Sequence, residues 1–225
     1  MEIDLSKPIL ERNELLAAEN RRRFEEHGIF VLDLLASPGA GKTSTILATI
    51  AALRDRYRIA VIEGDIASKV DAEKVKAHGI PAVQINTGGA CHLESDMIQR
   101  AVAALPIEDL DLIIVENVGN LVCPTEFDLG ENAKVMILSV PEGHDKPYKY
   151  PAIFSRSEAI ILNKYDTIGF FDFDEAEFRE VVGKLNGAAP IFPMAATKGE
   201  GVDAWAEWLA ARIDAVKAAS TVREG

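Results

Sequence analysis

Several short segments of this 225-residue chain carry side chains suited to binding a nucleotide. In ASPGAGKTST, residues 36–45, Gly41, Lys42 and Thr43 match the phosphate-binding pattern G-x-x-x-x-G-K-[ST], with Ala36 in place of its first glycine. The backbone N–H groups of such a loop surround a phosphate, the lysine reaches the β- and γ-phosphates, and the threonine hydroxyl binds Mg²⁺. An ordinary glycine-rich turn is the alternative. The residues expected to contact phosphate are Pro38, Gly39, Ala40, Gly41, Lys42, Thr43 and Ser44.

Two carboxylates are expected to complete a Mg²⁺ site with Thr43. Asp65 and Glu116 each follow an apolar run, so both would lie at the carboxyl ends of strands, although each could instead be a helix cap or a solvated end residue. Asp71 is a candidate for orienting the attacking water, or equally for capping its helix, and Gly119 would let the backbone pass close to the γ-phosphate. The predicted catalytic residues are Lys42, Asp65, Asp71 and Glu116.

A third apolar run ends in NKYD, residues 163–166, which has the pattern N-K-x-D. The Asp166 carboxylate can accept hydrogen bonds from N1–H and the 2-amino group of guanine, whereas adenine offers neither donor. Asn163 is expected to tie this loop to the phosphate loop, and the stem of Lys164 to lie along the base. The expected pocket also includes Ala196, whose N–H would face the guanine O6, and Thr197. The pattern therefore favours GTP over ATP.

The only two cysteines of the chain, Cys91 and Cys123, both follow predicted strands, and His92 is next to the first of them. Thiolate and imidazole together suit Zn²⁺, Ni²⁺ or Cu⁺ better than Mg²⁺. The alternative is two buried thiols beside an unremarkable histidine. Because three ligands do not close a site, two chains meeting at this edge would supply six.

The alternation of apolar runs with helical stretches predicts one doubly wound α/β domain over residues 1–225, with a mainly parallel seven-stranded sheet of the P-loop NTPase type. A helix over about 8–27 would pack on this domain or extend from it. The expected strands are Ile29–Leu35, Arg58–Ile62, Ala82–Ile85, Asp111–Glu116, Val135–Val140, Ala159–Leu162 and Ile191–Pro193. The other expected helices are Lys42–Arg54, Asp71–Ala77, His92–Ala104, Pro151–Ser155, Glu175–Leu185 and Asp203–Ala218. Two features stay unassigned: Asp33 has no evident partner in its apolar strand, and loop 141–150 would either close over the nucleotide or contact a second subunit.

The composition narrows the classes of partner. With 24 basic and 36 acidic residues the net charge is −12, which disfavours nucleic acid. No apolar stretch approaches the ~20 residues of a membrane span, so no membrane association is expected. The acidic and polar start MEIDLSKPIL is unlike a signal peptide. Reduced thiols and a cytoplasmic location are therefore expected.

In order along the chain, ASPGAGKT, EGDIASKVDAEK, NTGGACHL, ENVGNLVCP, EGHDKPYKYPAIF and NKYD resemble the nickel-inserting GTPases of [NiFe]-hydrogenase maturation, the HypB family. The resemblance runs from about residue 8 to 215. It implies hydrolysis of GTP to GDP and phosphate, homodimerisation when GTP is bound, and a Ni²⁺ or Zn²⁺ site of Cys91, His92 and Cys123 at the dimer interface. It also implies metal exchange with a small zinc-containing nickel chaperone and delivery to the hydrogenase large subunit.

Three alternatives stay open from sequence alone. The urease-accessory nickel GTPases share the phosphate loop and N-K-x-D but lack this cysteine arrangement. A small-molecule P-loop kinase would need an arginine-bearing lid, yet no arginine lies between Arg100 and Arg156. A binding module with an inactive nucleotide site conflicts with the intact Lys42 and Thr43. Since nothing marks an arginine finger, hydrolysis is expected to be slow, about 10⁻⁴ s⁻¹.

Overall fold

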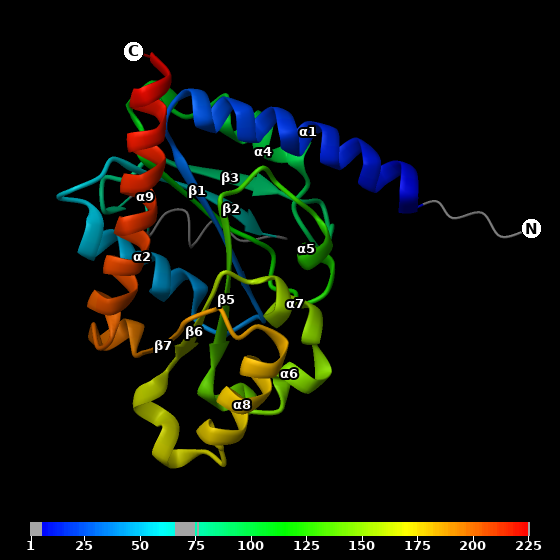
Figure 1. Ribbon diagram of the computed structural model, residues 1–225, viewed down its shortest axis with the longest axis vertical. Helices are drawn as coiled ribbons and strands as arrows, with labels where there is room; N and C mark the ends of the chain where they lie inside the picture. Colours follow the sequence, from blue (N-terminus) through cyan, green and yellow to red (C-terminus); the bar gives the residue numbers. More distant parts are fainter. Residues whose placement is uncertain (1–5, 66–74, 76, 225) are drawn as a thin grey trace, which may run out of the picture.

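Seven strands form the central sheet of the computed structural model, which describes residues 6–65, 75 and 77–224 (Figure 1). The strand order is β3-β2-β4-β1-β5-β6-β7, and every pairing is parallel. The strands are β1 Phe30–Ala36, β2 Ile59–Asp65, β3 Ala82–Asn86, β4 Leu112–Glu116, β5 Ala133–Ser139, β6 Ala159–Asn163 and β7 Ile191–Met194. The predicted seven-stranded, doubly wound α/β fold is confirmed.

The sheet is apolar on both faces because helices cover both of them. The helices are α1 Ser6–Glu26, α2 Lys42–Leu53, α4 Ser95–Val102, α5 Cys123–Glu126, α6 Lys146–Lys149, α7 Pro151–Arg156, α8 Glu175–Leu185 and α9 Val202–Glu224. Short 3₁₀ turns span Ile107–Asp109, Val140–Glu142, Tyr165–Phe170 and Ala196–Lys198. One apolar cluster packs α2 and α9 against one face, and two others lie under α1 with α4 and under α7 with α8 (Figure 1). None of the helices within the described residues has the length and apolar character that crossing a bilayer requires.

The order of the strands places the predicted ligands at one edge. β1 and β5 are neighbours, but the chain passes from β1 to β2 on one side of the sheet and from β5 to β6 on the other. Such a switch point is where an open parallel sheet binds its ligands. Glu116 and Asn163 are the last residues of β4 and β6, and Asp65 is the last residue of β2.

The structure differs from several of the sequence-based expectations. The helix expected from His92 begins at Ser95, because tertiary contacts already hold the preceding backbone: the Leu93 N–H bonds to the Asn117 side chain and the Ser95 N–H to that of Asn13. Residues 146–149 of the expected loop 141–150 form α6, and residues 165–173, whose sequence also reads as a long loop, contain the 3₁₀ turn Tyr165–Phe170. The helix expected at Asp71–Ala77 falls mostly outside the described residues.

Helix α1 is fastened to the sheet domain by two nearly buried asparagines and one partly exposed ion pair. Asn13 accepts a hydrogen bond from the Ser95 N–H at 2.8 Å and donates to the Asp128 carbonyl at 2.7 Å. Asn20 donates to the Ser95 carbonyl at 3.0 Å. Arg21 forms a two-pronged ion pair with the Asp128 carboxylate at 2.8 and 2.9 Å. The start of α4 is therefore bonded directly to α1.

Asp33, left without a partner by the sequence, belongs to a buried ionic network. Its carboxylate accepts hydrogen bonds from Asn117 Nδ2 at 3.1 Å and Lys134 Nζ at 3.2 Å. Lys134 also pairs with Glu131 at 2.7 Å. Burial opposes the Lys134 charge, but the two carboxylates outweigh it and hold the pKa of Lys134 above its usual value. The polar atoms are thus paired inside an otherwise apolar face.

A second buried carboxylate joins β4 to α9. Asp111 accepts hydrogen bonds from the Arg58 backbone N–H at 2.8 Å and pairs with Lys217 Nζ at 2.8 Å. Burial alone would raise its pKa, but the bonds from Arg58 and Lys217 prevail and lower the pKa of Asp111 to about 2. A depressed folded-state pKa stabilises the fold above the unfolded pKa of about 4, and that stabilisation disappears as the pH falls toward 2.

Replacing Asp111 by asparagine is therefore expected to lower the free energy of unfolding by about 2 kcal/mol at pH 7, and by about half as much near pH 3. Urea denaturation at both pH values measures this difference. Asp109→Asn is the matched control, because Asp109 faces the same Arg58 at 3.5 Å but is 76% exposed, so a change below about 0.5 kcal/mol is expected. Equal losses in the two variants would contradict the role given to Asp111.

Candidate functional site

The phosphate loop lies between β1 and α2. Gly41 precedes the first residue of α2 with φ 98°, and a Cβ at that position would be 2.4 Å from Asn163 Nδ2, so only glycine fits there. Ala36 is the last residue of β1, and Lys164 is the one non-glycine residue with positive φ among the described residues. Ala36 therefore occupies the first glycine position of the pattern without backbone strain.

Hard oxygen ligands gather at the start of α2. Thr43 Oγ1 lies 3.3 Å from Glu116 Oε1, which joins the phosphate loop to the end of β4. Glu63, 2% exposed, is paired in register with Glu116 and was not singled out in the sequence. Hydroxyl and carboxylate oxygens are the ligands that Mg²⁺ takes in proteins, so this corner fits the cation. Asp65 follows two positions after Glu63, whereas Asp71 lies outside the described residues.

Gly119 lies against the phosphate loop. A Cβ on Gly119 would be 3.0 Å from Pro38 Cγ and 3.1 Å from Pro38 N. Any larger residue would push the two loops apart. The backbone leaving β4 is thus packed directly on the loop predicted to bind phosphate.

The N-K-x-D segment is bonded to the same loop. Asn163 Nδ2 donates to the Ala40 carbonyl at 2.9 Å, which is the expected tie, and Lys164 Nζ donates to the Gly39 carbonyl at 2.8 Å. Asn163 Oδ1 accepts the Ala196 N–H at 3.2 Å. Lys198, absent from the predicted set, pairs with Asp166 at 2.9 Å. Thr197 is exposed in the turn beside them. A purine entering this pocket would compete with Lys198 for the Asp166 carboxylate.

Cys91, His92 and Cys123 come together, although they are separated by up to 32 residues in sequence. One ligand atom from each of the three lies within 4.8 Å of the others. Cys91 is exposed, whereas the other two are partly buried. Because Cys91 and His92 lie beyond the end of β3 and Cys123 lies beyond the end of β4, the cluster is at the same edge as the phosphate loop. Two soft sulfurs and one imidazole nitrogen fit Ni²⁺ or Zn²⁺.

The surroundings of His92 hold its ring in place. The imidazole stacks on Phe127 with ring centroids 3.8 Å apart. Its Nε2 is buried without a hydrogen-bond partner among the described residues and lies 3.6 Å from Glu94 Oε1. Burial lowers the pKa of His92, with Glu94 opposing it, so the ring is neutral near pH 7 and has a nitrogen lone pair available. A hydrogen bond with Cys123, aided by burial, raises the pKa of Cys91.

Comparison with known proteins decides the family. The nucleotide-binding domain of the CobW/HypB/UreG family matches residues 31–193. "Hydrogenase maturation factor HypB" of Escherichia coli K12 is 44% identical over 207 residues, which span 92% of this chain and 71% of that protein. The chain belongs to the HypB family.

Two matches to HypB of Helicobacter pylori were also found. The crystal structure of its HypB in complex with nickel superposes with a TM-score of 0.86 at 38% identity, over 90% of this chain and 95% of that one. "Hydrogenase/urease maturation factor HypB" of strain J99 is 40% identical over 212 residues, spanning 92% of this chain and 87% of that protein. As a HypB-family member the chain is a GTPase, so the small-molecule kinase alternative is set aside.

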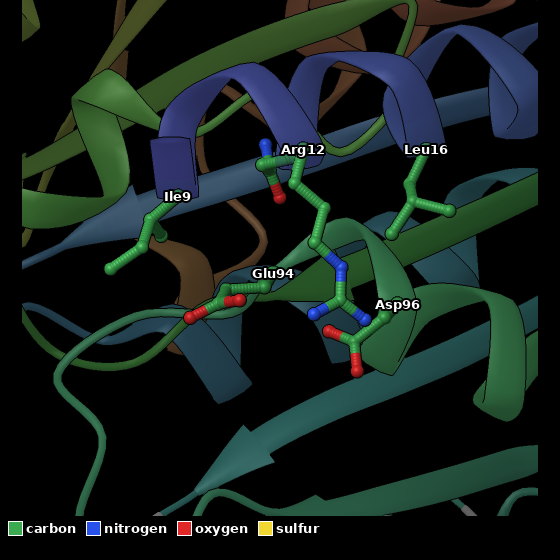
Figure 2. A pocket seen from close by; sticks show the side chains of 6 residues that line it. Ile9, Arg12, Leu16, Glu94 and Asp96 are labelled. Carbon is green, nitrogen blue, oxygen red and sulfur yellow. The ribbon is translucent and has the colours of Figure 1, made fainter. Parts of the chain in front are cut away.

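A cavity of about 220 Å³ lies between the first half of α1 and the start of α4 (Figure 2). Its lining residues are Ile9, Arg12, Asn13, Leu16, Glu94 and Asp96. Figure 2 shows the Arg12 side chain pointing down from α1 toward Asp96. Glu94 also faces His92, so the cavity borders the cluster of Cys91, His92 and Cys123.

Several residues that shape the site were not predicted from the sequence. Glu63 carried a signal, since it stands two positions before Asp65 and thus on the same face of β2. No local sequence pattern marked Lys198, Asn117 or Asn120, because each acts through a contact with a distant segment. Such contacts depend on the fold and leave no local pattern.

Proposed function

We propose that this HypB-family GTPase couples GTP binding and hydrolysis to the delivery of nickel for [NiFe]-hydrogenase maturation. The main support is that the phosphate loop and the Cys/His cluster lie at one edge of one sheet. Residues 116–123 run from one to the other: Glu116 meets Thr43, and Cys123 belongs to the cluster. Relatives named as hydrogenase maturation factors and a family structure in complex with nickel support the same proposal.

The geometry of the phosphate loop supports the following proposed nucleotide contacts. Backbone N–H groups of residues 39–44 would surround the β-phosphate, and Lys42 would neutralise the β- and γ-phosphates. Thr43, Glu116 and Asp65 would hold Mg²⁺, which draws charge from the transferring phosphoryl group. Asp71 would orient the attacking water. Asp166 would select guanine, with Asn163 and Lys164 fixing the base loop to the phosphate loop.

Nickel would be cargo at the cluster, with Zn²⁺ as its competitor. Cys91, His92 and Cys123 supply three ligands from one chain, so a second chain in a GTP-bound homodimer would complete the coordination. The thiols bind metal only when reduced, and the proposed place of action is therefore the cytoplasm.

The cavity beside the cluster is the proposed docking region for a small zinc-containing nickel chaperone. Glu94 both lines this cavity and faces His92, so a partner held there would sit next to the cargo. Ile9 and Leu15 of α1 are 51% and 70% exposed and give the same helix an apolar surface. The proposed recipient is the hydrogenase large subunit. Because one relative is named for both hydrogenase and urease maturation, urease is the second candidate recipient.

Equilibrium dialysis against Ni²⁺, with GDP or a non-hydrolysable GTP analogue present, tests this function. We expect nickel binding in the micromolar range or tighter, a nucleotide-dependent change in that affinity, and dimers by light scattering only with the analogue. GTP turnover is expected to be slow, on the order of 10⁻⁴ s⁻¹. ATP in place of GTP is the control and should have no effect. A chain that binds GTP but no nickel in either state would overturn the metal-delivery function.

A further inference from the structure

The stretch that leaves β4, residues 116–123, touches the nucleotide side and the metal side in turn. Glu116 faces Thr43, Gly119 lies against Pro38, and Cys123 is a member of the cluster. Two asparagines, Asn117 and Asn120, stand between these contacts. Their side chains face the loop that carries His92.

Asn117 holds the residue that follows His92. Its side chain is 1% exposed, and its Oδ1 accepts the Leu93 N–H at 3.3 Å and the Val118 N–H at 2.9 Å. Its Nδ2 donates to Asp33 Oδ1 at 3.1 Å. Because β1 fixes Asp33, the bond to Leu93 is made by a side chain with little freedom to turn.

Asn120 holds the residue that precedes His92. Its Nδ2 donates to the Cys91 carbonyl at 3.1 Å, and its Oδ1 accepts the Val122 N–H at 3.0 Å. Both neighbours of His92 are therefore bonded to the 116–123 stretch. If this stretch moves, Cys91, His92 and Cys123 move with it.

A packing contact adds the end of β2 to this arrangement. The Leu93 side chain is fully buried, and a Cβ on Gly64 would lie 2.8 Å from Leu93 Cδ1. Gly64 immediately precedes Asp65. The His92 loop thus rests against the ends of β2 and β4, which carry the carboxylates predicted to hold Mg²⁺.

We propose that Asn117 and Asn120 are positioning residues that make the geometry of the metal cluster depend on the nucleotide, an inference that rests on the proposed function. A change at the γ-phosphate is felt first at Glu116 and Gly119. The two asparagines pass the displacement to Cys91 and Leu93, on either side of His92. The three ligands then approach or separate together, so cargo affinity follows nucleotide state.

The variant Asn120→Ala tests this coupling in the full-length chain. The measurement is the Ni²⁺ dissociation constant with GDP and with the GTP analogue, by competition with a chromophoric chelator. We expect the two constants to differ by at least about fivefold in the unmodified protein and by less than about twofold in the variant. All three ligands remain in Asn120→Ala, so it is expected to bind nickel in both states.

Asn186→Ala is the matched control. Asn186 also holds loop backbone in place, because its side chain donates to the carbonyls of Phe154, Ser155 and Ser157. These contacts lie at the amino ends of the strands, away from the cluster. Asn186→Ala should keep the full difference between nucleotide states. Hydrogen–deuterium exchange of the peptide containing Leu93 gives a second readout: exchange should depend on nucleotide in the unmodified protein and no longer in Asn120→Ala.

The outcomes separate this inference from the proposed function. An Asn120→Ala protein with the unmodified difference between nucleotide states would overturn the role of the asparagines. Equal nickel affinities in both states of the unmodified protein would also overturn it, while leaving a nickel-binding GTPase. Absence of nickel binding in the unmodified protein would instead remove the proposed function on which the inference rests.

Discussion

Replacing Asp166 by asparagine is expected to lower the affinity for GTP roughly a hundred- to a thousandfold and to create binding of xanthosine triphosphate. The carboxylate would accept two hydrogen bonds from guanine, each worth about 1.5–3 kcal/mol when one partner is charged. The amide presents its NH₂ group to one of these donors, so one bond is lost and two hydrogens collide. Xanthine has an oxygen in place of the 2-amino group of guanine. This oxygen accepts a hydrogen bond from the amide NH₂ group.

Competition with a fluorescent guanine nucleotide measures both affinities. Lys198 pairs with Asp166 at 2.9 Å, so the substitution also frees an exposed ammonium group without burying a charge. Asp172→Asn is the matched control, because Asp172 is exposed on the loop that follows and should leave both affinities unchanged. Unaltered GTP binding by Asp166→Asn would refute the assignment of the base pocket.

Replacing Cys123 by alanine is expected to weaken Ni²⁺ and Zn²⁺ binding by more than about a hundredfold. Loss of a group that merely orients a ligand typically costs 10–100-fold, and Cys123 supplies a ligand atom itself. The remaining Cys91 and His92 leave a two-ligand site open to water, which holds a divalent ion poorly.

Metal titration against a chelator of known affinity, followed by anomalous scattering at the nickel edge in crystals, checks this result. His27→Ala is the control, since His27 lies in the turn after α1 and pairs with Glu108 away from the cluster. Thermal melting of both variants establishes that they fold. Persistence of full nickel affinity in Cys123→Ala would mean that the metal binds elsewhere.

Local patterns predicted the elements that position the site. The run before Gly41 gave a buried strand because its residues are apolar on both faces, and Glu116 and Asn163 were placed at strand ends because each interrupts such a run. The seven strands and their parallel direction were predicted from their alternation with helices, whereas their order in the sheet was not. Patterns of this kind lie within a few residues, where the sequence alone specifies the geometry.

Non-local bonds account for what the sequence did not predict. The late start of α4 depends on Asn13, which is 82 residues away from Ser95. Lys198 reaches Asp166 only because the turn after β7 is beside β6. Asparagine is common in loops, so neither Asn117 nor Asn120 signals in advance which distant backbone group it will bind.

The buried network around Asp33 has a consequence for how the chain selects its strand alignment. Asp33 on β1 is directly opposite Lys134 on β5 in the parallel register. A slip of one residue would carry the carboxylate to the opposite face of the sheet and leave the ammonium group of Lys134 without its β1 partner in apolar surroundings. Misaligned pairings of β1 with β5 are thereby penalised during folding. The correct alignment pairs Ala36, the last residue of β1 before the phosphate loop, with Ile137 of β5.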